Sequence, residues 1–280
     1  MHRPKTIQLF LPDGNARSVR IAEITSRTVQ AIQVPRTKLS LAAERAETAQ
    51  VGVYFLLGED EDTGKPLVYV GEAEDCLKRL GQHHRSKDFW QRAVVVVSKT
   101  SALTKAHVKY LEGYCYEQIQ AAGRYALVNA ATPTKSFLPE PAVADVLDTF
   151  DTMQILLSTL GFPLFEPLAS KSPETHLYHC TGRGASARGE YTEDGLVVLA
   201  GSTAAADEVP SASASVRGLR QRLRDESVLE VTPEGPHRFT RDHAFASPSA
   251  AAGAVLGRTA NGWVEWKDAA GRTLDEIERA

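Results

Sequence analysis

One short run of the sequence, RAVVVVS at residues 92–98, constrains the fold more than any other segment. Its four consecutive valines are β-branched and favour an extended backbone. A short, uninterrupted apolar run of this kind is typical of a buried strand rather than of a half-exposed one. We therefore predict a buried strand at this place in the chain.

The surrounding block, residues 49–132, supplies partners for that strand. VGVYFLLG and LVYVG have strand character and are joined by the acidic turn EDEDTGKP, which indicates a hairpin with a long loop. AEDCLKRLGQHH and ALTKAHVKYLEGYCYEQIQAAG have helical spacing, and Gly123 is placed to end the second helix. The order β-β-α-β-α predicts an α+β unit with a small sheet.

The rest of the chain divides into four further segments. Residues 1–48 are predicted to form an N-terminal extension with a β-hairpin, a third strand and a helix. Residues 133–164 hold an amphipathic helix that we expect to pack on the preceding domain, and residues 165–176 read as a linker rich in Pro and Ser. Residues 177–280 are predicted to form a second α+β domain, with a basic helix and, near residues 247–268, a helix, a turn and an aromatic strand.

Composition sets limits on the class of protein. The chain has 280 residues with 42% hydrophobic and 24% charged residues, as in ordinary globular proteins. Its three cysteines are far apart, which argues against a zinc site or a disulfide framework. No signal peptide or membrane helix is evident, so we expect a cytoplasmic protein without a membrane partner. The net charge of −3 means that any nucleic-acid binding must use a local basic surface.

Several polar residues stand where they could serve either chemistry or packing. Tyr54 and Tyr69 lie on adjacent predicted strands, so their hydroxyls meet if both rings share one face, although most strand tyrosines are packing residues. Arg79 lies beside the apolar face of its helix and could equally be a surface residue. His83 and His84 follow one turn later and could be structural, contact phosphate or shuttle a proton.

Two more candidates come later in the block. Glu112 lies next to the buried stripe of its helix, where a carboxylate is uncommon unless it is paired or binds a metal. An ion pair with Lys109 or Arg79 is the alternative. Asn129 ends a short apolar run, where it could also cap a turn.

Taken in order, these residues resemble the GIY-YIG nuclease family. Gly52-Val53-Tyr54 and Tyr69-Val70-Gly71 correspond to the two tripeptides that give the family its name, each with Val in place of the central Ile. Arg79, Glu112 and Asn129 follow at the positions that the family pattern requires. The resemblance covers residues 49–132 and implies a small three-stranded antiparallel sheet flanked by helices.

The resemblance also implies roles for the residues. Glu112 would be the protein carboxylate that binds one Mg²⁺ or Mn²⁺ ion, which polarises the scissile phosphate. Tyr69, with Tyr54 as the less favoured alternative, would activate the attacking water. Arg79 would neutralise charge on the phosphate, and Asn129 would hold the geometry of the site.

Two features depart from the family, Glu72 and the acidic hairpin loop, and the small size of Gly71 needs a reason. Position 72 is Glu, where many relatives carry Lys or Gln, and we expect it to repel phosphate, as would the acidic hairpin loop. Gly71 is expected to be small because the strand turns there into the helix beside a phosphate.

The C-terminal domain contains the runs VVLAGS (197–202), RDHAFASPSAAAGAVLGRTANGWVEWKD (241–268) and GRTLDE (271–276). In these runs it resembles a domain of unknown function of the 4357 type, which often follows GIY-YIG domains. Its segment from residue 247 is also similar to domains associated with restriction and methylation systems. There Arg258, Asn261, Trp263 and Trp266 could form a surface that stacks on or reads bases, or the tryptophans could be core residues. The basic helix offers a set of predicted phosphate contacts, namely Arg217, Arg220, Arg222 and Arg224.

The sequence therefore predicts a divalent-metal-dependent endonuclease that acts on nucleic acid, with DNA favoured, and that carries a C-terminal targeting module. A non-catalytic nucleic-acid-binding protein on the same fold and a protein-interaction adaptor are the alternatives.

Overall fold

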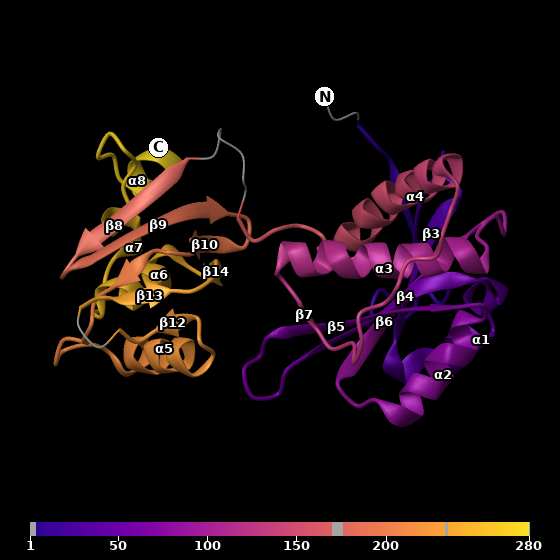
Figure 1. The fold of residues 1–280 in the computed structure, drawn as a ribbon, viewed down its shortest axis with the longest axis horizontal. Helices are drawn as coiled ribbons and strands as arrows, with labels where there is room; N and C mark the ends of the chain where they lie inside the picture. The colour runs from indigo at the N-terminus through magenta and orange to yellow at the C-terminus, as the bar shows by residue number, and fades with distance from the viewer. Residues whose placement is uncertain (1–3, 170–175, 233–234, 280) are drawn as a thin grey trace. The chain divides into compact units, whose positions relative to one another are not determined.

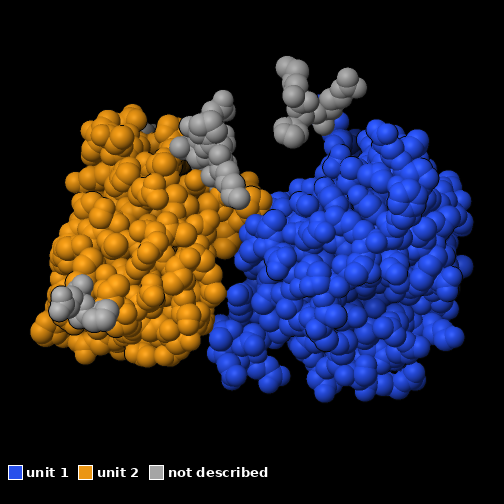
Figure 2. Space-filling view, in the orientation of Figure 1, with its two compact units in different colours: residues 1–166 blue, residues 167–280 orange. Residues whose placement is uncertain are grey.

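The chain forms two compact units, Met1–Glu166 and Pro167–Ala280 (Figure 2). The structure, a computed structural model, describes residues 4–169, 176–232 and 235–279. Both units combine sheets with helices, which confirms the predicted α+β class. The linker predicted at residues 165–176 lies partly outside the described residues.

The first unit is built on one seven-stranded sheet with the strand order β1-β2-β3-β6-β4-β5-β7 (Figure 1). Its strands are β1 (Ile7–Phe10), β2 (Arg20–Ile24), β3 (Val29–Pro35), β4 (Gly52–Glu59), β5 (Pro66–Ala73), β6 (Trp90–Ser98) and β7 (Ala126–Leu127). Neighbouring strands are antiparallel except β5 and β7, which are parallel.

The valine run lies at the centre of this sheet, in β6. β6 pairs with β3 on one side and with β4 on the other, and Val94–Val97 are at most 1% exposed. The prediction of a buried strand is confirmed. β4, β5 and β6 are the three strands expected from residues 49–132, but the sheet continues beyond them because β3 also pairs with the valine strand. The segment predicted as an N-terminal extension is therefore part of the same sheet.

Helices cover both faces of the sheet (Figure 1). They are α1 (Leu39–Ala43) and α2 (Cys76–Ser86) on one face, and α3 (Lys105–Ala122) and α4 (Glu140–Thr159) on the other. Two short 3₁₀ turns, Arg36–Lys38 and Ala46–Ala49, flank α1. Strand residues alternate between the two resulting cores: Tyr54 and Leu56 face α1 and α2, whereas Val53 and Phe55 face α3 and α4.

Local signals set the helix ends as expected. The Asp75 carboxylate accepts a hydrogen bond from the backbone N–H of Lys78 and begins α2. The Thr104 hydroxyl accepts one from the backbone N–H of His107 and begins α3. Gly123 ends α3 in the left-handed conformation, at φ 68°, which confirms the predicted C-cap.

The second unit has two small sheets and four helices among its described residues. Its strands are β8 (Leu177–Gly182), β9 (Ala185–Thr192), β10 (Gly195–Val198), β11 (Thr203–Ala204), β12 (Leu229–Glu230), β13 (His237–Phe239) and β14 (His243–Phe245). Its helices are α5 (Ala214–Asp225), α6 (Pro248–Leu256), α7 (Gly262–Glu265) and α8 (Leu274–Glu278). The strand orders are β14-β10-β9-β8 and β11-β13-β12.

The aromatic strand predicted near residues 262–268 is wrong. The segment begins with the helix α7, because the Asn261 side chain accepts a hydrogen bond from the backbone N–H of Trp263 and caps a helical turn. Within the described residues no helix combines the length and the apolar character that a membrane span requires.

Candidate functional site

The two tyrosines of the tripeptides lie on the same face of the sheet. Tyr54 of β4 is opposite Gly71 of β5, and Tyr69 of β5 is opposite Leu56 of β4. The side chains of residues diagonally placed in this way project from one face. The two ring centroids are 6.3 Å apart and the planes are inclined by 22°. Both rings therefore share one face of the sheet, which was the condition for a shared site.

Gly71 leaves the space that the Tyr54 ring fills. A Cβ atom built on Gly71 would collide with the Tyr54 hydroxyl and with the adjacent ring carbon. β5 continues past this residue to Ala73, so Gly71 does not turn the chain into the helix. The expected reason for its small size was wrong: the residue is small because a tyrosine from the neighbouring strand lies against its backbone.

Helix α2 brings Arg79 and His83 to the buried Tyr54. Arg79 Nε donates to the Tyr54 hydroxyl over 3.3 Å, and that hydroxyl lies 2.8 Å from His83 Nε2. Burial, then the charges of Arg79 and Lys87, lower the pKa of His83 to about 4, so its ring is neutral at neutral pH. A neutral ring can accept at Nε2, which lets the Tyr54 hydroxyl accept from Arg79 and donate to His83.

Tyr54 and Tyr69 differ in their surroundings. Tyr54 is 1% exposed, and burial raises the pKa of its hydroxyl well above the usual range. Tyr69 is only partly buried, and Lys87 Nζ lies 4.6 Å from the centroid of its ring. The hydrogen bond to Tyr54, together with the proximity of Tyr69, raises the pKa of Arg79.

His83 was not predicted as the partner of Tyr54, and Lys87 was not predicted as part of the site. His83 is 4% exposed, so the prediction that it contacts nucleic acid is corrected. The spacing of four from Arg79 to His83 was the available signal, since residues four apart share one helix face. Lys87 follows the end of α2 with an extended backbone, so this spacing does not predict its position. His84 is exposed and accepts from Arg36 Nε over 3.2 Å, away from this cluster.

Glu112 reaches the site from α3. Its carboxylate lies near the backbone of Glu72, and its charge acts on Tyr54. Burial first, and the nearby Glu72 carboxylate second, raise the pKa of Glu112 to about 7. No Lys, Arg or His within the described residues forms an ion pair with Glu112, so the predicted alternative of a bridge to Lys109 or Arg79 is wrong.

Glu72, the residue expected to repel phosphate, has its own counterion. Lys105 Nζ lies 2.8 and 2.7 Å from the two carboxylate oxygens of Glu72. These two residues and Arg79 line a surface hollow of about 380 Å³ beside the cluster. The ion pair neutralises much of the negative charge that a phosphate would meet there.

Asn129 fixes the strand that carries Tyr69. Its Nδ2 donates to the Val70 carbonyl over 2.8 Å, and its Oδ1 accepts from the Val70 N–H over 3.1 Å. The side-chain amide thus extends the short pairing of β5 with β7 by one more pair of hydrogen bonds. Val70 lies between Tyr69 and Gly71, so Asn129 holds both at their positions in the sheet.

The residues fit a single magnesium-type ion better than a multi-ligand metal. Within the described parts of the chain, no three His, Cys, Asp or Glu side chains come together in a way that could hold a metal ion. Mg²⁺ needs only one or two protein carboxylates, because it keeps several waters and binds substrate phosphate. Glu112 is a partly buried carboxylate with a raised pKa, an environment in which a bound cation favours the ionised form.

The four arginines predicted to contact phosphate have different environments in α5. Arg220 is fully buried, and its guanidinium donates to Glu208 and to the carbonyls of Ala205 and Ala254. Its predicted contact with phosphate is therefore wrong. Arg224 also binds Glu208, whereas Arg217 and Arg222 are exposed.

The four residues of the predicted base-reading surface also have different environments. Trp266 is fully buried and donates through Nε1 to the Pro248 carbonyl, so it is a core residue and cannot stack on a base. Asn261 caps α7, and Arg258 forms an ion pair with Glu265. Trp263 is partly buried, with the Arg279 guanidinium 3.4 Å from a ring centroid, so its face is already occupied.

The fold and the cluster define an α+β protein with a tyrosine-arginine-histidine centre beside a carboxylate. Residues 178–278 match the family described as a domain of unknown function, DUF4357, which confirms the C-terminal part of the resemblance. No match to a GIY-YIG family was found for the preceding residues. No curated protein and no solved structure is similar enough to match the chain.

Proposed function

We propose that residues 49–132 hold a GIY-YIG-type nuclease site and that the chain is a divalent-metal-dependent endonuclease acting on DNA. The observation that carries the proposal is the convergence of Tyr54, Tyr69 and Arg79, with Glu112 from a separate helix on the same cluster. These residues span about sixty positions of sequence, and packing alone gives no reason for a polar cluster of this composition.

Tyr69 is the proposed general base. The hydroxyl of Tyr54 is buried and bonded to His83, and its raised pKa opposes the phenolate form. Tyr69 is more open to solvent, which leaves its hydroxyl accessible to an attacking water, and the cations Lys87 and Arg79 lie beside it. In the proposed reaction the Tyr69 oxygen takes a proton from the attacking water, while Tyr54 and His83 hold Arg79 in place.

Arg79 and Glu112 act on the phosphate side of the reaction. Arg79 has donors directed to solvent and would neutralise the charge that develops on the phosphate. Glu112 would hold the divalent ion, which when bound supplies Lewis-acid polarisation of the scissile phosphate. Asn129 keeps β5, and with it Tyr69, in position.

In the C-terminal unit, Arg217 and Arg222 remain as proposed phosphate contacts because both are exposed on α5. Contacts of this type add affinity and salt dependence without sequence information. They would make the second unit a targeting module for the nuclease.

The test compares Tyr69→Phe with Tyr54→Phe in nicking of supercoiled plasmid with Mg²⁺. Loss of the general base lowers the rate by about 10²- to 10⁴-fold. We expect Tyr69→Phe to show that loss, Tyr54→Phe to show a smaller one, and Tyr116→Phe, a control on α3, to show none. Nicking that survives in Tyr69→Phe at the wild-type rate would remove Tyr69 from the reaction. Salt-sensitive DNA binding without any nicking would favour a non-catalytic binding protein.

A further inference from the structure

A second hollow lies at the other end of β4 and on the other side of the sheet. It has a volume of about 350 Å³, and three apolar or aromatic side chains and three polar ones define its chemistry. These are Leu57, Tyr125 and Phe162, and Glu59, Gln91 and Arg92. Leu57 belongs to the core that faces α3 and α4, whereas Tyr54 belongs to the opposite core. None of the lining residues belongs to the proposed catalytic cluster, so the hollow is separate from it.

A β-bulge directs two consecutive polar side chains into this hollow. Leu57 pairs with Arg92 and the next residue of β4, Gly58, pairs with Trp90, so Gln91 is an extra residue in β6. Regular alternation would send Gln91 to the face opposite Arg92, yet both line the hollow while Trp90 enters the other core. A Cβ on Gly58 would collide with the Phe89 carbonyl, so this close approach of the backbones requires glycine. Bulges of this kind redirect side chains next to binding sites.

The polar side chains of the hollow offer both acceptors and donors. Neither Glu59 nor Arg92 forms an ion pair within the described residues, and both are exposed. Arg20 lies close to Arg92: burial, and then the Arg92 charge, lower the pKa of Arg20. Arg20 donates hydrogen bonds to Gln33 and to the Leu160 carbonyl. Its positive charge adds to that of Arg92 near the hollow.

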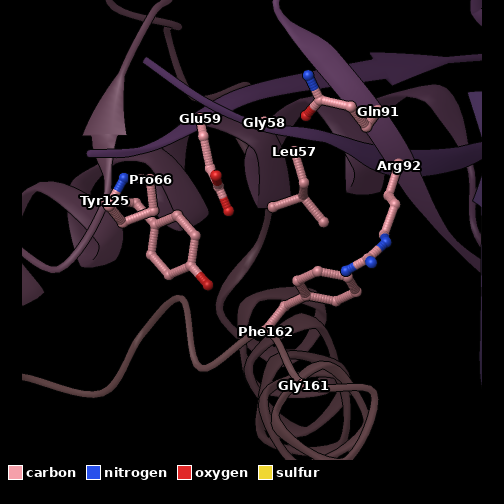
Figure 3. Close-up of a pocket in the computed structure, with 9 residues that line it drawn as sticks. All are labelled: Leu57, Gly58, Glu59, Pro66, Gln91, Arg92, Tyr125, Gly161 and Phe162. Carbon is pink, nitrogen blue, oxygen red and sulfur yellow. The ribbon is translucent and has the colours of Figure 1, made fainter. Parts of the chain in front are cut away.

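Two aromatic side chains line the hollow. In Figure 3 the rings of Tyr125 and Phe162 lie on two sides of Leu57, and the Glu59 carboxylate points between them. The Arg92 side chain extends from β6 toward Phe162 (Figure 3). Pockets of a few hundred Å³ with apolar walls and a few polar groups bind small molecules, and flat aromatic ligands gain most from aromatic walls.

We propose that this hollow binds one guanine base. Guanine presents N–H groups on one edge, which a carboxylate such as Glu59 accepts, and the O6 and N7 acceptors on another, which an arginine such as Arg92 reads. Gln91 donates through Nε2 to the Phe89 carbonyl over 3.2 Å, and its Oε1 can accept from the N–H edge of the base. The shared chemistry is a guanine nucleotide, either a free mononucleotide or an unpaired nucleotide within a nucleic-acid strand.

The experiment is calorimetric titration of the full chain in EDTA, so that no strand is cut. The ligands are GMP, IMP, ribose 5-phosphate, and the single strands TTGTT and TTTTT. We expect saturable binding of GMP, with IMP at least about tenfold weaker because it lacks the exocyclic amine. Ribose 5-phosphate should not saturate. TTGTT binding without GMP binding would assign the site to a nucleotide within a strand, and GMP binding alone would assign it to the free nucleotide.

Two variants place the ligand in this hollow. Glu59→Gln should remove most of the difference between GMP and IMP, and Arg92→Gln should weaken the guanine ligand by at least about tenfold. Glu61→Gln, an exposed residue of the hairpin loop, is the matched control and should bind as the wild type does. Both changes are at exposed side chains, and circular dichroism checks the fold. Guanine ligands that bind no better than ribose 5-phosphate and TTTTT, or equal affinity in all three variants, would overturn the proposal.

Discussion

Arg79 in the first unit and Arg220 in the second occupy similar places in the sequence and opposite places in the structure. Each lies on an amphipathic helix beside buried leucines, Leu80 and Leu223. Arg220 is fully buried, and its donors go to Glu208 Oε1 at 2.7 Å and to the carbonyls of Ala254 and Ala205 at 2.5 Å each. Arg79 is exposed, and among the described residues its hydrogen-bond acceptors are two side chains, the Tyr54 hydroxyl and Gln82 Oε1.

The difference between the two arginines lies in what uses their donors. Backbone carbonyls are fixed in position by the fold, so the donors of Arg220 that bind them are not available to a ligand. The partners of Arg79 are the buried Tyr54 hydroxyl and the exposed Gln82 amide, so the donor that binds Gln82 can bind a phosphate instead. The two arginines therefore mark a structural and a functional use of the same residue type.

The largest effect is expected from removing Arg220. Arg220→Ala leaves two buried carbonyls without their donor and Glu208 with Arg224 as its remaining partner, which costs about 3–5 kcal/mol in the free energy of unfolding. Urea denaturation of the full chain measures it, with the exposed Arg217→Ala as the control. A loss below about 1 kcal/mol would mean that the carbonyls find other donors. Arg220 would then not be the structural counterpart of Arg79.

Removing Arg79 should lower the rate of plasmid nicking and leave the stability of the protein nearly unchanged. Arg79→Ala should slow plasmid nicking by about 10²- to 10³-fold, the usual effect of losing one donor to a developing negative charge. The free energy of unfolding should change by less than about 1 kcal/mol, because the residue is exposed. Arg85→Ala, on the exposed side of the same helix, should leave both unchanged. An Arg79 variant that unfolds as readily as Arg220→Ala would make it structural as well.

Gly71 tests how tightly the tyrosine cluster is packed. Gly71→Ala should destabilise the first unit by about 1–3 kcal/mol, because the new methyl group must displace the Tyr54 ring. Gly81→Ala, in α2, is the matched control: nothing lies near its Cβ position, so better helix propensity should stabilise by about 0.5–1 kcal/mol. Thermal unfolding of both variants gives the comparison. Equal effects of the two substitutions would show that Tyr54 moves without cost.

His83 should make the cluster sensitive to acid. Its folded pKa of about 4 lies below the unfolded value, so the unfolded state binds more protons and stability falls as the pH drops from about 6.5 to 4. After allowance for solvent screening, this one group should account for about 1 kcal/mol between pH 7 and pH 5. His83→Gln should lose that part of the pH dependence in urea denaturation at the two pH values. An unchanged difference would mean that His83 is protonated beside Arg79.

The sequence predicted the fold class and the tyrosine pair because both depend on alternation along single strands. It did not predict seven strands, because the pairing of Val29–Pro35 with the valine strand joins residues about sixty positions apart. His83 could have been found from its spacing of four after Arg79, whereas Lys87 could not, because it follows the end of α2. Arg220 could not, because its burial depends on carbonyls of Ala205 and Ala254, whose positions are set by the tertiary fold.

The most direct test of the proposed nuclease is plasmid nicking by Glu112→Gln, with and without Mg²⁺. Glutamine keeps the size of the side chain but not its charge, and Glu117→Gln, exposed on the same helix, is the matched control. The wild type and Glu117→Gln should nick in Mg²⁺ and stop in EDTA, whereas Glu112→Gln should be slower by at least about 10³-fold, as expected when the carboxylate that holds the ion is lost. Metal-dependent nicking at the wild-type rate by Glu112→Gln, or none by the wild type with any divalent ion, would contradict the proposed site.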